Sequence, residues 1–340
     1  MNNSLVVVSV IMPIYNESKY INTCVESLLL QDYPKEKMEW IFVDGNSSDD
    51  TIDKLREYQK VYPKLIIIKN NPNKIVPYAM NIGIKESCGK YIVRMDAHAD
   101  YKTDYISKCV SLLDSGDMDN VGGVAETKAK GFVGNAIAKM LSSRFGVGNS
   151  EFRVNGKSGY VDTVPFGAFR REVFSKYGGY DERLVRNQDN EMNYRIRKNG
   201  GKIFLSDEIH LSYYCRDSIK GIAQMAIKNG QWNVITMKLC PGSMGLRHFV
   251  PMAFVLSLLF FIIMGIFWNV FLWALMAEVL LYLVIDVIFS INQSNKVLEA
   301  MLLILLHPLF HVSYGFGSMS GLIKLVKKEY RGNSYSAPRL

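Results

Sequence analysis

Short apolar runs alternate with amphipathic segments over the first hundred residues of the chain. Four runs rich in Val, Ile and Phe have the length and apolarity of strands buried on both faces, at residues 5–12, 39–43, 65–69 and 91–95. Between them, three segments carry apolar residues at helical spacing, at 18–30, 51–61 and 77–87. Strands that alternate with helices of about ten residues predict an α/β fold with a Rossmann-like, mostly parallel sheet flanked by helices.

The alternation becomes irregular after residue 120. Residues 181–198 have helical periodicity, and residues 216–239 form an amphipathic, basic segment. We therefore expect one large α/β domain over residues 1–240.

Two long apolar stretches follow at residues 249–267 and 270–291. Each approaches the roughly 20 residues that a helix needs to cross a bilayer, and only Trp268 and Asn269 separate them, so they predict a tight hairpin. The second stretch contains Glu278 and Asp286, and acids at such depth usually face protein, water or a substrate path. The alternative is that Glu278 pairs across the hairpin and Asp286 lies at the membrane interface.

A third apolar stretch, residues 297–319, is interrupted by His307, Pro308 and His311. Basic residues precede 249 and follow 320, and both groups favour the cytoplasmic side of a membrane. Two crossings place both groups on that side, whereas three do not. We therefore expect a membrane-anchoring region at 241–331 whose third stretch is re-entrant or interfacial, a flexible tail at 332–340, and a cytoplasmic catalytic domain at the cell membrane.

The net charge of +8 and the pI of about 9.0 indicate an anionic partner. A compact Lys/Arg run is missing from the sequence, so nucleic acid is disfavoured against anionic lipid or a phosphate-bearing substrate. The five cysteines are scattered and never form a C-x-x-C pair, which argues against a zinc site or a disulfide framework.

Polar residues gather where three predicted strands end. The segments 13–17, 44–50 and 96–100 all follow strands, and ligands of parallel sheets bind at the carboxyl ends of the strands. Asp44 has no local helix to cap, so its carboxylate is a candidate acceptor for base N–H or ribose hydroxyl groups. Asp49 and Asp50 suit the first turn of the next helix instead.

The segment Asp96-Ala-His98-Ala-Asp100 alternates polar and small residues. In an extended conformation all three polar side chains would lie on one side, with successive i,i+2 positions roughly 6.5–7 Å apart. Two carboxylates and an imidazole suit Mn²⁺ or a related ion, whereas Mg²⁺ favours more oxygen. The alternative is a loop built on Asx turns.

A third cluster contains Asp189 and Glu191. Glu191 and Arg195 are spaced as an i,i+4 ion pair and could serve only as helix support. Asp189 has no basic partner on its own helix face and is a candidate general base, although spacing alone leaves that role open.

These clusters, in this order, resemble the family 2 inverting glycosyltransferases with a GT-A fold. The resemblance covers residues 8–237 and rests on six segments, VSVIMPIYNE, WIFVDGNSSDDT, MNIG at 80–83, VRMDAHADY, GGYDERLVRNQDNEMNYRIRKNG and, loosely, GQWNV at 230–234. The D-A-H variant and the hydrophobic C-terminal region are similar to the subgroup that builds exopolysaccharides, including succinoglycan-type enzymes.

The resemblance assigns roles to individual residues. It implies that the nucleotide is bound by Pro13, Tyr15, Glu17, Asp44, Asn81 and Asp96. It implies metal ligation by Asp96, His98 and Asp100, with Mn²⁺ or Mg²⁺ as cofactor, and a general base at Asp189. It places Gln188, Glu191, Gln231 and Trp232 in the acceptor region. Two departures from the family pattern are His98, which stands at a usual aspartate, and Gln188, which stands at a usual glutamate.

The implied activity is metal-dependent transfer of a sugar from a nucleotide diphosphate sugar, UDP-linked, to a polyprenyl-diphosphate-linked glycan in exopolysaccharide or capsule assembly. The alternatives are a polyprenyl-phosphate sugar synthase, a processive synthase that also exports its polymer, and a catalytically silent nucleotide-binding membrane scaffold. The basic residues before the membrane region, Lys220, Lys228, Lys238 and Arg247, would meet either the acceptor diphosphate or anionic headgroups.

Overall fold

The computed structural model describes residues 6–154 and 156–327. The described chain forms two compact units, residues 6–126 with 156–213 and residues 127–154 with 214–327. The predicted flexible tail at 332–340 lies outside the described residues. This division differs from the predicted boundary at residue 240. The difference arises because residues 214–239 pack with the C-terminal helices, as described below.

The first unit begins with four parallel strands, as predicted. They are β1 (Val8–Ile14), β2 (Met38–Asp44), β3 (Ile66–Asn70) and β4 (Tyr91–Arg94), in the order β3-β2-β1-β4. Every residue of β2 and β4 is buried, which explains the apolar runs Trp40–Val43 and Tyr91–Val93.

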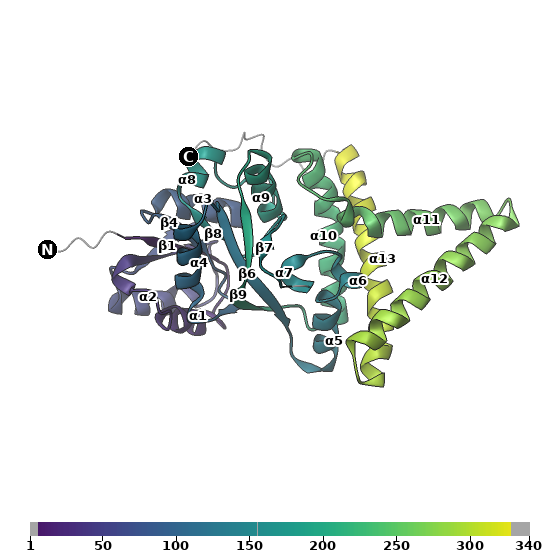
Figure 1. Cartoon of the computed structure of the whole chain (residues 1–340), viewed down its shortest axis with the longest axis horizontal. Helices are drawn as coiled ribbons and strands as arrows, with labels where there is room; N and C mark the ends of the chain where they lie inside the picture. Colours follow the sequence, from purple (N-terminus) through teal and green to yellow (C-terminus); the bar gives the residue numbers. More distant parts are fainter. Residues whose placement is uncertain (1–5, 155, 328–340) are drawn as a thin grey trace. The chain divides into compact units, whose positions relative to one another are not determined.

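Three helices connect these strands, α1 (Ile21–Leu29), α2 (Thr51–Val61) and α3 (Val76–Glu86) (Figure 1). Helix α3 packs on β1 through Gly83, where an added Cβ would lie 2.4 Å from Ile11 Cγ2. The glycine of the MNIG segment is therefore required for the close approach of this helix to the sheet.

The sheet continues beyond β4 with antiparallel neighbours. Strand β8 (Ala168–Arg170) pairs antiparallel with both β4 and β6 (Asn120–Lys128), and the order then continues through β9 (Ile203–Tyr214) to β5 (Ala99–Tyr101), with β7 (Gly159–Tyr160) also paired to β9. The helices of this part are α4 (Tyr105–Ser115), α8 (Glu172–Tyr177) and α9 (Gln188–Lys198). The sheet is thus mixed and mostly parallel in its first half.

Helix α9 begins later than predicted. The helical periodicity started at Asp181, but the Asp181 carboxylate accepts hydrogen bonds from the Arg183 backbone and guanidinium groups, and this local turn replaces the first helical turns. The helix itself starts after Asn187, which has a left-handed backbone (φ 63°).

The second unit is helical. It contains α5 (Gly131–Leu141), α6 (Arg144–Val147), α7 (Glu151–Val154), α10 (Ile219–Leu239), α11 (Val250–Gly265), α12 (Asn269–Gln293) and α13 (Val297–Lys327). Ile222 and Ala226 of α10 are buried with residues of α5 and α13 in one hydrophobic cluster. Helix α10 therefore belongs with the membrane helices, which the predicted boundary at 240 missed.

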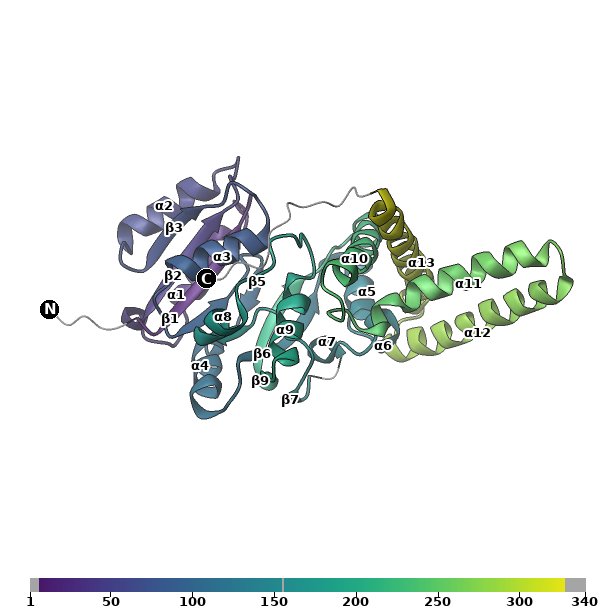
Figure 2. The same ribbon diagram turned by 90° about the horizontal axis from the view of Figure 1, so that it is seen from above.

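Three helices in the described chain are long and apolar enough to cross a membrane, Leu246–Gly265, Asn269–Gln293 and Val297–Lys327. The first two match the predicted hairpin (Figure 2). The re-entrant form of the third stretch is wrong, because α13 is one uninterrupted helix with Pro308 inside it. The interfacial form stays a prediction.

The two acids of α12 have different partners. Glu278 Oε1 accepts a hydrogen bond of 2.6 Å from Ser257 Oγ of α11, so it pairs across the hairpin as the alternative predicted. Asp286 is fully buried and contacts His307 Nδ1 of α13 at 2.7 Å. The depth of Asp286 relative to a membrane interface stays a prediction.

Candidate active site

The loops after β1 and β2 are joined at the carboxyl edge of the sheet. Ile14 and Asp44 are register partners, and Asn16 links the loops beyond them. The Asn16 backbone N–H donates to Ser47 Oγ at 2.9 Å, and the Ser48 N–H donates to Asn16 Oδ1 at 2.8 Å. Asn16 has a left-handed backbone (φ 54°), a conformation that asparagine tolerates better than most residues.

This junction presents groups that suit a nucleoside. The Asp44 carboxylate is nearly buried and accepts from Ser47 N at 3.1 Å and from Ser47 Oγ at 2.6 Å. The Tyr15 ring is exposed beside Gly45, with Lys74 Nζ 5.9 Å from the ring centre. A ring surface, a carboxylate acceptor and a cation are the groups that bind a base, a ribose and a phosphate. Pro13 lies beneath them in β1, paired with Val43.

The Asp96–Asp100 segment is not extended as predicted. Ala99 N–H donates to Asp96 C=O at 3.3 Å and closes a turn, while Asp96 N–H donates to the Tyr101 hydroxyl at 2.8 Å. Asp100 lies on the exposed side of β5. The three side chains therefore do not lie along one extended segment; the turn is closed by a backbone hydrogen bond, and the Asx-turn alternative stays a prediction.

The turn brings His98 to the first loop. His98 Nδ1 lies 3.1 Å from Glu17 Oε1, and Glu17 is largely buried. Over residues 6–154 and 156–327, no three His, Cys, Asp or Glu residues lie close enough together to hold a metal ion.

Arg94 connects this turn with the predicted base. Its guanidinium group forms an ion pair with Asp189 through Nη1, and its Nε lies 3.4 Å from Asp96 Oδ1. The guanidinium group also lies over the Phe166 ring, 5.7 Å from its centre. Phe166 has a left-handed backbone (φ 46°), and its carbonyl accepts from the Tyr105 hydroxyl at 2.7 Å. A bulky residue in this conformation is strained, and such strain often marks functional sites.

Arg94 was not among the site residues predicted from the sequence. The available signal was an arginine at the end of the apolar run Tyr91–Arg94, because a buried guanidinium group requires carboxylate partners. The structure supplies both partners from segments that the sequence had assigned separately, Asp96 and Asp189.

The environment of Asp189 alters its proton affinity. Partial burial at the first turn of α9 raises the pKa of the Asp189 carboxyl, the Arg94 guanidinium opposes this rise, and the nearby Asp96 charge adds to it. A carboxylate with a raised pKa is a stronger base than an exposed aspartate, which is suited to accepting a proton from a hydroxyl group.

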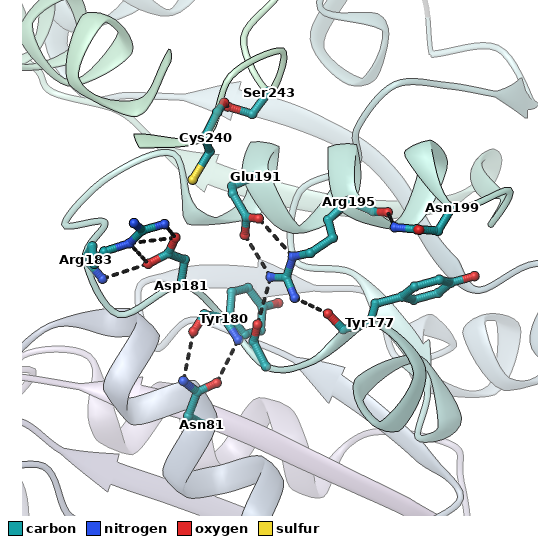
Figure 3. A network of polar contacts seen from close by, with 11 residues as sticks. Asn81, Tyr177, Tyr180, Asp181, Arg183, Glu191, Arg195, Asn199, Cys240 and Ser243 are labelled. Carbon is teal, nitrogen blue, oxygen red and sulfur yellow. Dashed lines mark hydrogen bonds and ion pairs between the residues drawn. The ribbon is translucent and has the colours of Figure 1, made fainter. Parts of the chain in front are cut away.

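Two other predicted site residues hold the loop that precedes α9 (Figure 3). Asn81 donates from Nδ2 to Tyr180 C=O and Glu182 Oε1, both at 2.9 Å, and Oδ1 accepts from Tyr180 N–H at 2.8 Å. Glu191 forms the expected pair with Arg195, with two contacts of 2.8 Å, and Arg195 also donates to Gly179 C=O at 2.7 Å. Both side chains thus support the loop, and a nucleotide role for Asn81 stays a prediction.

The remaining acceptor-region residues fall in different units. Gln188 precedes Asp189 and is buried, and its Oε1 has no hydrogen-bond partner within the described part of the chain. Gln231 lies in α10, where its amide donates to Ser320 Oγ of α13 at 3.1 Å, and the half-buried Trp232 is its neighbour. Gln231 therefore contributes to helix packing, and acceptor contact by these residues stays a prediction.

Comparison with known proteins identifies the family of the chain. The model of the family described as glycosyl transferase family 2 matches residues 9–178. A protein from Methanococcus voltae is 30% identical over 325 residues, 93% of this chain and 97% of that protein; its name is dolichyl N-acetyl-alpha-D-glucosaminyl phosphate 3-beta-D-2,3-diacetamido-2,3-dideoxy-beta-D-glucuronosyltransferase. The succinoglycan biosynthesis protein ExoA of Rhizobium meliloti (strain 1021) is 26% identical over 246 residues, 72% of this chain and 74% of that protein.

A solved structure shares the fold. The mannosyltransferase PcManGT from Pyrobaculum calidifontis, in complex with GDP-Man and Mn²⁺, superposes with a TM-score of 0.59 at 17% identity, covering 95% of this chain and 87% of that one. The family match extends over half the chain, and the Methanococcus relative is similar over nearly its whole length. The chain belongs to glycosyltransferase family 2.

Proposed function

We propose that the protein is an inverting glycosyltransferase that moves a sugar from a UDP-linked donor to a glycan carried on polyprenyl diphosphate, in exopolysaccharide or capsule assembly. The observation that carries this proposal is the ion pair of Arg94 with Asp189, which places a candidate base beside the Asp96 turn at the sheet edge.

The proposed reaction is a single displacement. Asp189 takes the proton of the acceptor hydroxyl as its oxygen attacks the anomeric carbon, and the bond from that carbon to the diphosphate oxygen breaks. Attack in line with the leaving group inverts the anomeric centre, so an α-linked donor gives a β-linked product. Arg94 orients the Asp189 carboxylate, and Tyr15 and Asp44 bind the nucleoside.

A divalent ion, Mn²⁺ or Mg²⁺, belongs to the proposal. Asp96 and His98 would hold it together with donor phosphate oxygens, because a carboxylate and an imidazole suit Mn²⁺. When bound, the ion would neutralise charge on the departing diphosphate. Asp100 is the weakest of the three predicted ligands, since it lies on the exposed side of β5.

The acceptor is proposed to be a sugar hydroxyl and not a lipid phosphate. The name of the Methanococcus relative describes transfer to a sugar already attached to a dolichyl phosphate, and a hydroxyl acceptor requires the base that Asp189 would supply. The catalytic unit is proposed to lie on the cytoplasmic side, which the basic residues flanking the apolar helices favour.

The test is a donor panel with the full-length protein in lipid nanodiscs. UDP- and GDP-linked sugars are supplied with polyprenyl-diphosphate-linked acceptors, and released nucleotide and lipid-linked product are measured with and without Mn²⁺. One UDP-sugar is expected to give product of inverted configuration. Background release from every donor in the presence of Mn²⁺ would support the silent scaffold instead.

A further inference from the structure

Helices α10 and α13 lie side by side and run in the same direction (Figures 1 and 2). Glycines allow this close packing. An added Cβ on Gly317 would lie 2.2 Å from Ile227 O, one on Gly230 would lie 2.1 Å from Tyr314 O, and one on Gly321 would lie 2.6 Å from Gln231 O. The two helices therefore stay in close contact and extend alongside each other over much of their length.

Helix α10 exposes charged side chains. Lys220, Lys228 and Lys238 are exposed, and so are Ile219 and Ile227. Helix α10 has 21 residues, so it extends about 30 Å, close to the thickness of the hydrocarbon core. It is not one of the three described helices that are apolar enough to cross a membrane.

This pairing conflicts with a membrane-crossing α13. If α13 crossed the bilayer, the adjacent α10 would lie in the hydrocarbon, with Lys228 near its middle, at the level of Gly317. Charged side chains at that depth are costly and normally face protein or water, yet the Lys228 side chain is exposed.

The surface of α13 fits an interface instead. At intervals that return to one side of the helix, α13 exposes the large apolar side chains Val297, Leu298, Met301, Leu305, Phe316, Leu322, Ile323 and Val326. Such spacing forms a narrow stripe on one side of a helix, as in helices that lie at a membrane surface. In both views, α11 and α12 project across the direction of α13.

We propose that α10 and α13 form a two-helix platform that lies along the membrane surface, while only α11 and α12 enter the bilayer. The α13 stripe contacts the boundary between headgroups and acyl chains. Lys220 and Lys228 of α10 contact anionic phospholipid headgroups, whose negative charge complements theirs. The platform thus fixes the second unit against the membrane by contacts that the hairpin alone does not provide.

The number of crossings tests the proposal without any activity measurement. A reporter fused before residue 1, one fused after residue 340 and one inserted between Trp268 and Asn269 are located in sealed vesicles by protease access. Two crossings place both terminal reporters on one side and the hairpin reporter on the other. Terminal reporters on opposite sides would overturn the proposal.

Depth of insertion provides the second measurement. The full-length protein in nanodiscs is cross-linked with lipids that carry a photoreactive group either near the headgroup or at the end of the acyl chain, and labelled peptides are mapped. We expect the deep probe to label α11 and α12 but not α13, and the shallow probe to label α13. Deep labelling of α13 equal to that of α12 would contradict the platform.

The headgroup contact has a matched control. A photoreactive phosphatidylglycerol headgroup should label residues 219–239, and the double substitution Lys220→Gln/Lys228→Gln should reduce this labelling severalfold. The control, Lys60→Gln/Lys64→Gln, changes two exposed lysines of the first unit and should leave the labelling unchanged. Equal labelling of all three proteins would exclude headgroup binding by these lysines.

Discussion

The guanidinium group of Arg94 forms an ion pair with the carboxylate of Asp189, joining two segments that lie 95 residues apart in the chain. Arg94 ends strand β4, and Asp189 lies in the first turn of α9. Because Asp96 also lies beside Arg94, this one cation connects the turn after β4 with the candidate base.

Removing that cation should destabilise the protein and abolish its activity. Arg94→Met leaves two carboxylates without their partner, and since 36% of the Asp189 side chain is exposed, the expected loss is about 1.5–3 kcal/mol. The measurement is urea unfolding of the variants. The double variant Arg94→Met/Asp189→Asn should regain part of this stability but no activity. Equal stability of Arg94→Met and the natural chain would show that the pair contributes nothing.

The acid limb of the pH–rate profile should lie above that of an ordinary aspartate. Burial raises the pKa of Asp189, and only the deprotonated carboxylate can accept a proton. Turnover should therefore rise with pH through a value above the reference of about 3.9, measured at saturating donor and Mn²⁺.

The raised pKa of Asp189 should make folding stability fall with rising pH, whereas it makes turnover rise. The folded state holds the Asp189 proton more tightly than the unfolded state, so this group favours folding at low pH and its contribution is lost as pH rises through the folded-state pKa. Asp189→Asn should remove this dependence. An acid limb at or below the reference value would contradict a raised pKa.

Metal dependence should distinguish the predicted ligands. Chelation should stop sugar transfer, and Mn²⁺ should restore it. His98→Ala should weaken Mn²⁺ activation by about 10–100-fold or more, whereas Asp100→Asn, on the exposed side of β5, should leave it unchanged. Equal weakening by both substitutions would restore the three-ligand interpretation.

The buried pair in the membrane region should behave as one unit. Asp286 and His307 are fully buried, with 2.7 Å between Oδ1 and Nδ1, and Phe145 of α6 packs on the His307 ring at 5.0 Å between centres. Asp286→Ala or His307→Ala should each cost about 3–5 kcal/mol, because the other partner stays buried and unpaired. Thermal unfolding in nanodiscs should show that the double variant loses much less than the sum. Additive losses would mean that the two residues act independently.

The parallel half of the sheet was predictable from sequence because burial on both faces enforces continuous apolar runs. Helix α2 was predicted with the observed bounds, since its apolar positions follow the helical period and Asp49 accepts from the Thr51 N–H at its start. These features arise from residues that are close together in the sequence, so the spacing of apolar positions is sufficient to predict them.

The geometry of the candidate site depended on contacts between distant residues. Alternation at Asp96–Asp100 suggested a strand, but the Tyr101 hydroxyl binds the Asp96 N–H and stabilises a turn. The ion pair of Arg94 with Asp189 has no local signature at all. Helix α10 was assigned to the wrong unit for the same reason, because the glycines that pack it on α13 lie about 90 residues away.

The role of Asp189 as the general base is tested most directly by the turnover of Asp189→Asn. The assay uses the donor sugar identified by the donor panel and a lipid-linked sugar acceptor. We predict that kcat falls by about 10²–10⁴-fold, while the affinity for the nucleoside diphosphate, measured by calorimetry, stays the same. Unchanged turnover in this variant would contradict the role of Asp189 as the base and would favour a phosphate acceptor, which needs none.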